Sequence, residues 1–172
     1  MKFSIRDIVY IGMLTALMVL ATFLFIPLPT GGMVHMGSAA LFTISSLFGG
    51  LYGGISAALG SAIFDMISGK YVYTLYSIVI KGICGLLVGY IVIGLRPQKK
   101  PLNKAIIIRI VLAIILGAIW TAAGYFVAWA DVYNSYEMAF ARLPASFLTS
   151  GVGFIVSIFL IPAIWSIRNK KK

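Results

Sequence analysis

Long apolar stretches with almost no charge inside them decide what this chain can fold into. Short polar or glycine-rich links separate six such stretches, at approximately residues 8–27, 34–48, 50–68, 72–95, 105–127 and 144–167. A helix needs roughly 20 apolar residues to cross the ~30 Å hydrocarbon core of a bilayer. Only 10% of the 172 residues are charged, whereas a soluble domain carries roughly 25%. We therefore predict an all-α membrane protein in which residues 1–172 form one transmembrane domain.

The number of crossings depends on residues 37–68, which fit either one long helix or two helices that turn near Gly49. Lys and Arg residues in short loops concentrate on the cytoplasmic side. The basic clusters lie at residues 2–6, 96–104 and 168–172, and all three share one side only if residues 37–68 cross twice. We therefore predict six transmembrane helices, with the N- and C-termini cytoplasmic.

The net charge of +10 comes mainly from these basic clusters. The positions of these clusters indicate the topology. The same residues can also contact the anionic head groups of membrane lipids. We expect no nucleic-acid partner.

The residues that enzymes and metal sites need are scarce in this sequence. The chain has one histidine and one cysteine, Cys84, which lies in an apolar stretch. The sequence shows no nucleophile paired with a base and no glycine-rich phosphate loop of the Walker type. We expect a protein that binds or moves a solute, with no catalytic residues, no metal site and no cofactor.

Two ionisable residues lie deep inside predicted spans, Asp65 near the outer end of the third and Lys81 in the fourth. A charge at the bilayer centre costs about 2.5–3.5 kcal/mol on insertion scales, so such residues usually face the bundle interior or a wet cavity. Two interpretations remain open. The residues form an ion pair that joins the two helices, or they contact a bound solute.

Other polar and aromatic residues near the outer side are weaker candidates for solute contacts. His35 ends the first outer loop and either caps a helix or closes over a ligand. Tyr76, Trp120 and Tyr125 either face lipid, where aromatic residues favour the interface, or form a stacking wall. The third outer loop, predicted at residues 128–143, is the longest, and part of it could form an interfacial helix.

Small residues recur at the spacing that lets helices pack closely in lipid. Gly-rich faces at residues 50–62 and 82–89 predict close packing of the third and fourth spans. Gly12 and Ala16 form a small-xxx-small pair in the first span. This pair is isolated near the cytoplasmic end, which makes it a candidate contact for another protein.

The order of these features resembles the S components, the substrate-binding membrane subunits of energy-coupling factor (ECF) vitamin transporters. The resemblance rests on the basic start, the small-residue first span and a series of motifs in order: VHMG at 34–37, LFGGLYGG at 47–54, FD at 64–65, SGKY at 68–71 and KG at 81–82. It implies an S-component-like bundle. It also implies a transmembrane scaffold subunit and two cytoplasmic ATPases as partners, with Gly12 and Ala16 in the scaffold contact.

The resemblance also implies a substrate site and a substrate class. The family pocket is built from the first outer loop and the outer halves of the last three spans. It points to a set of substrate-binding residues: His35, Asp65, Tyr76, Lys81, Trp120, Tyr125 and Asn134. The substrate would be a water-soluble vitamin or precursor, most similar to hydroxymethylpyrimidine or pyridoxine. Riboflavin and pantothenate stay open, and a carboxylated ligand such as pantothenate would take Lys81 as its counter-ion. A structural membrane protein of the rod-shape-determining type is the alternative class.

Overall fold

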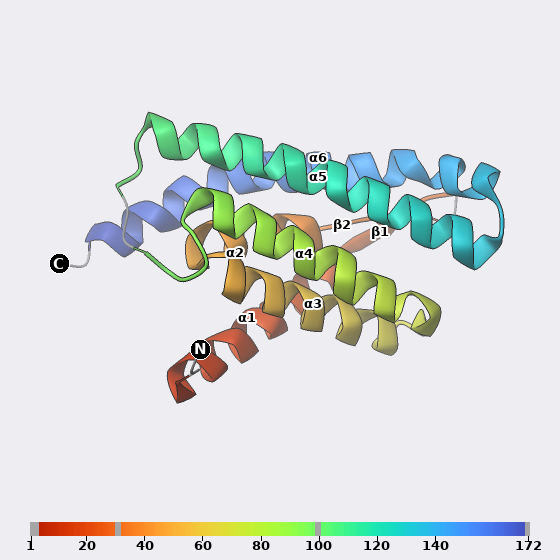
Figure 1. The fold of residues 1–172 in the computed structure, drawn as a ribbon, viewed down its shortest axis with the longest axis horizontal. Coiled ribbons are helices and arrows are strands. Elements are labelled where there is room, and N and C mark those ends of the chain that lie inside the picture. Colours follow the sequence, from red (N-terminus) through yellow and green to blue (C-terminus); the bar gives the residue numbers. More distant parts are fainter. Residues whose placement is uncertain (1–3, 30–31, 99–100, 171–172) are drawn as a thin grey trace.

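The computed structural model of the chain describes residues 4–29, 32–98 and 101–170, with side chains up to residue 167. It is a bundle of long helices with one small antiparallel hairpin (Figure 1). Along the chain the elements are α1 (Ile5–Phe23), β1 (Phe25–Pro27), β2 (Met33–His35), α2 (Gly37–Phe48), α3 (Gly50–Ile67), the 3-10 helix η1 (Tyr71–Tyr73), α4 (Thr74–Val92), α5 (Lys104–Tyr133) and α6 (Tyr136–Lys170).

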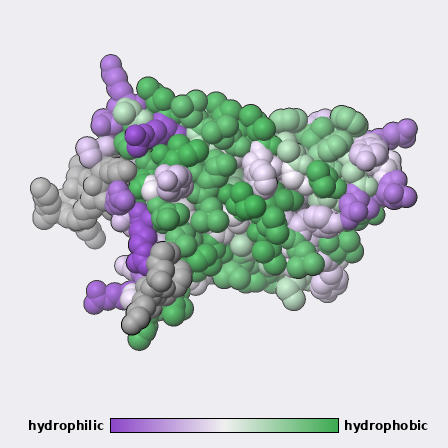
Figure 2. All heavy atoms as spheres, in the orientation of Figure 1, coloured by the Kyte–Doolittle hydropathy of each residue, from purple (hydrophilic) through white to green (hydrophobic). Residues whose placement is uncertain are grey.

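Five of the described helices, α1, α3, α4, α5 and α6, are long and apolar enough to cross a membrane. Figure 2 shows the matching surface, a broad apolar band between two hydrophilic ends of the molecule. The remaining helix, α2, has 12 residues, which span about 18 Å at 1.5 Å per residue. It is buried along almost its whole length, so it lies in the interior of the bundle and need not match the bilayer thickness. The mostly helical membrane fold is therefore confirmed, while the sixth crossing stays a prediction.

The segment before α2 differs from the predicted span at 34–48. Strand β2 occupies its first residues and pairs with β1, with Phe25 opposite His35 and Pro27 opposite Met33. The helix begins only at Gly37. The described residues of the predicted first outer loop thus belong to a hairpin between α1 and α2, in which β1 pairs with β2.

Helix ends follow local sequence signals. Ser4 caps α1 with a capping box, in which its hydroxyl accepts from the Asp7 N–H and the Asp7 carboxylate accepts from the Ser4 N–H. Gly49 separates α2 from α3 with a φ of 87°, a conformation that glycine adopts without strain. This is the turn that the sequence analysis placed there.

A long open loop at 128–143 is wrong, because the helical structure expected for part of this segment extends over nearly all of it. Helix α5 continues to Tyr133 and α6 begins at Tyr136, so the segment is helical except for a two-residue link. Asn134 makes this link possible because it takes the left-handed conformation (φ 47°, ψ 40°), which Asn tolerates better than most residues. Pro144, predicted to start the last span, lies inside α6.

Helices α3 and α4 pack with their backbones in direct contact. A Cβ added at Gly89 would lie 2.3 Å from the backbone nitrogen of Gly50, and one added at Gly85 would lie 2.6 Å from the Gly53 oxygen. The small-residue faces predicted for these two helices therefore meet each other.

The N-terminal end of α1, the α4–α5 connection and the C-terminal end of α6 lie at one end of the bundle, opposite the hairpin and the α5–α6 link (Figure 1). Five of the basic residues behind the predicted orientation, Lys2, Lys99, Lys100, Lys171 and Lys172, lie outside the described residues. The cytoplasmic position of both termini stays a prediction.

Candidate functional site

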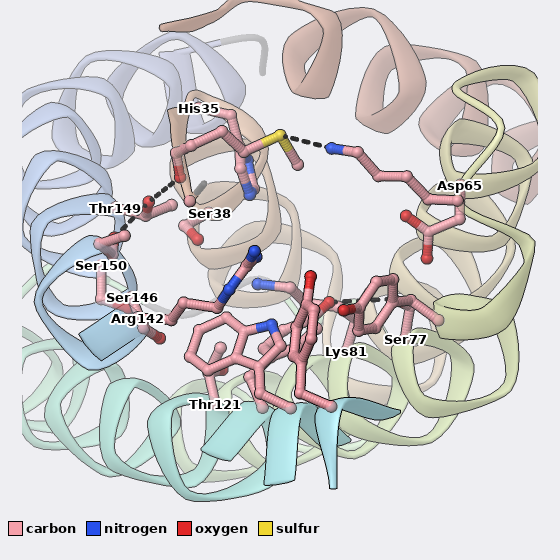
Figure 3. A pocket seen from close by; sticks show the side chains of 18 residues that line it. His35, Ser38, Asp65, Ser77, Lys81, Thr121, Arg142, Ser146, Thr149 and Ser150 are labelled. Atoms are coloured by element: carbon pink, nitrogen blue, oxygen red, sulfur yellow. Dashed lines mark hydrogen bonds between the residues drawn. The ribbon is translucent and has the colours of Figure 1, made fainter. Parts of the chain in front are cut away.

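A cavity of about 290 Å³ lies among the hairpin, α3, α4, α5 and α6. Its wall is unusually polar for the inside of a membrane bundle, with carboxylate, amine, guanidinium, imidazole and hydroxyl groups (Figure 3). The described residues that line it are Gly32, Met33, His35, Ser38, Asp65, Lys70, Tyr73, Ser77, Lys81, Thr121, Tyr125, Trp129, Tyr133, Arg142, Ala145, Ser146, Thr149 and Ser150.

His35 is fixed in this wall by the start of α2. Its Nδ1 accepts a hydrogen bond of 3.1 Å from the Gly37 N–H, so Nδ1 carries no proton and Nε2–H remains as a donor. Burial, reinforced by the positive charges of Lys81 and Lys70, lowers the pKa of His35 to about 3. The imidazole is therefore neutral at physiological pH.

The hairpin is tied to the helices on both sides of the cavity. The Lys70 amine, which follows α3, donates to the Met33 sulfur at 3.1 Å. On the other side, the Thr149 hydroxyl of α6 donates to the Met33 carbonyl oxygen at 3.0 Å. Burial is the main cause that lowers the pKa of Lys70. The hairpin thus forms one wall of the cavity and is held by weak polar contacts.

Asp65 and Lys81 both line the cavity and are each only 6% exposed. No ion pair closer than 4.0 Å joins Asp65 to Lys81, so the interpretation of these two residues as a direct ion pair is not met. Both side chains face the cavity instead. Lys81 instead lies over the Tyr125 ring, and Asp65 Oδ2 is buried without a hydrogen-bond partner in the described part of the chain.

Aromatic rings of α5 form another wall. Tyr125 and Trp129 stack with ring centroids 5.7 Å apart and an interplanar angle of 27°. The Tyr125 hydroxyl lies 3.0 Å from the Ser77 hydroxyl of α4, in hydrogen-bond contact. Such a surface suits the face of a flat ring.

Three of the predicted site residues lie outside the cavity wall. Tyr76 donates to the Asp131 carboxylate, which joins α4 to α5. Trp120 is 36% exposed, and its indole N–H donates to the Ile80 carbonyl oxygen. Asn134 is exposed because it ends α5 in the turn to α6. The predicted residues that the structure brings together in the cavity are His35, Asp65, Lys81 and Tyr125.

The sequence analysis missed the contribution of α6. Ser146, Thr149 and Ser150 line the cavity from that helix, opposite Asp65 on α3 (Figure 3). Their i, i+3, i+4 spacing in an apolar stretch marks one helix face and could have revealed them. Arg142, also in the wall, lies with its guanidinium carbon 4.6 Å from the Tyr133 ring centroid. The sequence does not point to Arg142, because the segment around it has the polar composition of a loop.

The opposite end of the bundle has a second cavity, of about 430 Å³. Asp7 and Tyr52 line it, and the Tyr52 hydroxyl donates to Asp7 Oδ1 at 2.5 Å. Arg96 lies 3.9 Å from Asp7 Oδ2. Nearby on α1, Gly12 and Ala16 are exposed, and an added Cβ at Gly12 would meet nothing within 4 Å. The small-residue face of α1 is therefore not used for packing within the chain.

Among the described residues, no three His, Cys, Asp or Glu side chains lie close enough together to form a metal-binding group. The charged side chains in the cavity wall are those of Lys70, Lys81, Arg142 and Asp65. Such an arrangement can bind a polar solute by hydrogen bonds and charge.

This chain is similar to a known protein family, to a relative and to a solved structure. The model of the family "ECF-type riboflavin transporter, S component" matches residues 2–166. A protein of Pyrococcus woesei, described as "Uncharacterized protein in gap 3'region", is 31% identical over 142 residues, which cover 76% of this chain and 87% of that protein.

A solved structure described as "Structure and mechanism of the S component of a bacterial ECF transporter" superposes with a TM-score of 0.70 at 18% identity. The match covers 96% of this chain and 98% of that one. At 18% sequence identity, this match shows that the two chains share a fold and shows nothing further.

Proposed function

This chain belongs to the family of S components of ECF-type riboflavin transporters, and we propose that it captures a flat, hydroxylated nitrogen heterocycle in the cavity between the hairpin and α3–α6. Its family and fold are those of a transporter subunit and not of an enzyme family. S components bind a small vitamin and work with a membrane scaffold and an ATPase module. Neither the family match nor the structural match supports the alternative class, a structural membrane protein of the rod-shape-determining type.

The observation that carries the proposal is the buried polar cavity itself. Asp65 Oδ2 and Ser150 Oγ lie in its wall without a hydrogen-bond partner within the described residues, and a buried polar group left unpaired costs about 1–3 kcal/mol. A ligand with ring nitrogens and hydroxyl groups would pair with them. The stacked rings of Tyr125 and Trp129 would hold its flat face.

Three vitamins or precursors combine a flat ring, ring nitrogens and hydroxyl groups: hydroxymethylpyrimidine, pyridoxine and riboflavin. The motifs around Asp65 and Lys81 favour the two smaller vitamins, and the family's description favours riboflavin. All three belong in the first set of binding experiments.

We propose six crossings with both termini in the cytoplasm of a prokaryotic cell, which places the hairpin and the cavity at the outer face. Two observations support this orientation. Both ends of the described chain lie at the same end of the bundle (Figure 1), and the described basic residues near that end include Arg6, Arg96 and Lys104. Substrate would then enter past the hairpin.

The proposed partner surface is the exposed face of α1 that contains Gly12 and Ala16. Because a small-residue face lets another helix approach closely in lipid, it suits the transmembrane scaffold of an ECF module. The two ATPases of that module would supply the energy.

The vitamin that copurifies with the protein tests the proposed function. The full chain is extracted in a mild detergent and denatured, and the released metabolites are identified by mass spectrometry. We expect a heterocyclic vitamin at near-stoichiometric amount. Ser150→Phe, which fills the cavity, should be empty, whereas the matched control Gly151→Ala, on the exposed face of α6 with nothing within 4 Å of the new Cβ, should retain it. Protein that is empty and takes up no B vitamin added back would contradict the proposal.

A further inference from the structure

The cavity wall has an excess of positive charge. Lys70, Lys81 and Arg142 line it, and Asp65 is the one carboxylate among its described lining residues. His35 adds no negative charge, because it is neutral and directs Nε2–H as a donor. The charges of the side chains in the wall therefore do not balance.

The other acidic residues of the chain are engaged elsewhere. The sequence has four in total. Asp7 pairs with Tyr52 and Arg96 at the opposite end of the bundle. Asp131 accepts from Tyr76, outside the cavity wall, and Glu137 is exposed in the first turn of α6. No second carboxylate of the described chain lines the cavity to compensate its cations.

Lys81 is buried, and Lys70 and Arg142 are partly buried. An excess of positive charge in such a site is unfavourable because a lower dielectric constant weakens solvation and strengthens repulsion. Lys70 has partial compensation from Asp65, from the Met33 sulfur and from the Phe64 ring, whose centroid is 5.4 Å from its amine. Lys81 has the face of the Tyr125 ring, at 5.4 Å. Neither ring removes the net charge, whereas an anionic group on the ligand would.

The neutral groups around these cations also suit an anion. Ser150, on α6, can donate a hydrogen bond because its Oγ has no partner among the described residues, and His35 Nε2 can donate as well. Figure 3 shows Arg142 extending from α6 toward the middle of the cavity, with Ser150 on the same side and Asp65 across from them. Lysines and arginines next to hydroxyl and N–H donors are the chemistry that binds carboxylate and phosphate groups.

We propose that the substrate is an anionic heterocycle, with a carboxylate or phosphate group held by Lys81 and Arg142 and a hydrogen-bond donor directed at Asp65. This inference rests on the proposed function, since it specifies the substrate class of the same cavity. It goes beyond the description of the family, which names riboflavin, an uncharged vitamin.

Binding of matched ligand pairs tests the inference. Each pair differs by one anionic group: riboflavin with riboflavin 5′-phosphate, pyridoxine with pyridoxine 5′-phosphate, and nicotinamide with nicotinate. Dissociation constants are measured by equilibrium dialysis on the full chain in nonionic detergent and phosphate-free buffer. We expect the anionic member of at least one pair to bind at least ~10-fold more tightly than its neutral partner, as charge-assisted hydrogen bonds predict.

Two variants locate the preference in the cavity. Lys81→Met keeps the length of the side chain and removes the charge, and it should reduce the preference to roughly 3-fold or less. Size-exclusion chromatography shows whether Lys81→Met folds. If it does not, Arg142→Gln provides the second test. Lys104→Met, which removes an exposed cation at the start of α5, is the control of equal charge change and should keep the full preference.

The possible failures are distinguishable. If the neutral member of every pair binds as tightly as the anionic one, the inference is overturned while vitamin binding stands. If the anionic ligand binds more tightly but neither Lys81→Met nor Arg142→Gln reduces this preference, then Lys81 and Arg142 do not bind the anionic group. If no member of any pair binds, both the inference and the proposed function fail.

Discussion

The Lys81 amine of α4 lies 5.4 Å from the centroid of the Tyr125 ring of α5. The ring is itself held by the contact of its hydroxyl with Ser77, at 3.0 Å. A buried cation and a positioned aromatic face thus lie next to each other in one cavity wall. This pair offers a ligand both a charge and a flat surface.

Tyr125 should contribute mainly through its ring. Tyr125→Leu removes the ring that lies next to Lys81 and that we propose stacks on the ligand. We expect binding to weaken about 3- to 30-fold, the range of a cation–π contact worth 0.5–2 kcal/mol. Tyr125→Phe keeps the ring and loses only the contact with Ser77, so it should bind within roughly 3-fold of the wild type. Titration calorimetry with the copurified vitamin measures both. Equal losses in the two variants would contradict a stacking role.

Gly37 should tolerate no side chain. An added Cβ would lie 2.4 Å from the Thr22 hydroxyl and 2.8 Å from His35 Nδ1. Overpacking of this kind costs about 1–3 kcal/mol, so Gly37→Ala should lower the melting temperature and, because His35 must shift, weaken ligand binding. Gly151→Ala has open space at its Cβ and should change neither. A Gly37→Ala protein with wild-type stability and affinity would show that His35 is not held as described.

His35 should make the protein less stable in acid. Above pH ~6.5, the ordinary histidine pKa, both the folded and the unfolded states hold a neutral imidazole, so the residue has no effect there. As the pH falls below this value the unfolded chain binds a proton, while the folded state stays neutral down to its pKa of about 3. Stability is therefore lost over this window, by at most about 1.4 kcal/mol per pH unit.

The variant His35→Asn checks this pH dependence, because Asn keeps an acceptor for the Gly37 N–H and does not titrate. Melting temperatures of both proteins in the same detergent are compared at pH 7.5 and pH 5.0. The wild type should lose more stability than the variant between the two. Parallel losses would mean that His35 is protonated as easily in the folded protein as in the unfolded one.

The exposed small face of α1 should be needed for transport and not for binding. Gly12→Leu and Ala16→Leu project bulk away from the bundle, so the isolated protein should fold and bind its vitamin normally. Uptake in proteoliposomes with the scaffold and ATPases should fall at least ~10-fold, since close helix packing is lost. Ala123→Leu, at an exposed position of α5, is the control. Full uptake by both α1 variants would exclude this face as the partner surface.

Features that depend on composition along one helix could be predicted from the sequence. The apolar stretches identified the long helices, Gly49 identified the turn between α2 and α3, and the glycine faces identified the close contact of α3 with α4. The deep charges Asp65 and Lys81 pointed to a polar interior because lipid excludes them.

Features that depend on contacts between distant segments could not be predicted. The strands β1 and β2 have three residues each, too few for a periodic pattern in a sequence already apolar. The polar segment 128–143 resembled a loop, yet it is helical because Asn134 alone makes the turn. Arg142, which lies in this segment, could therefore not be assigned to the cavity wall.

Fluorescence of Trp129 tests directly whether the vitamin occupies this cavity, because its ring lines the wall and stacks on Tyr125. In a protein that retains only this tryptophan, with Trp120→Phe and Trp165→Phe, we predict a saturable change in emission at one vitamin per chain, lost in Ser150→Phe and kept in Gly151→Ala. A vitamin that binds stoichiometrically without altering Trp129 emission, or that binds Ser150→Phe equally well, would place the site elsewhere and contradict the proposed function of the cavity.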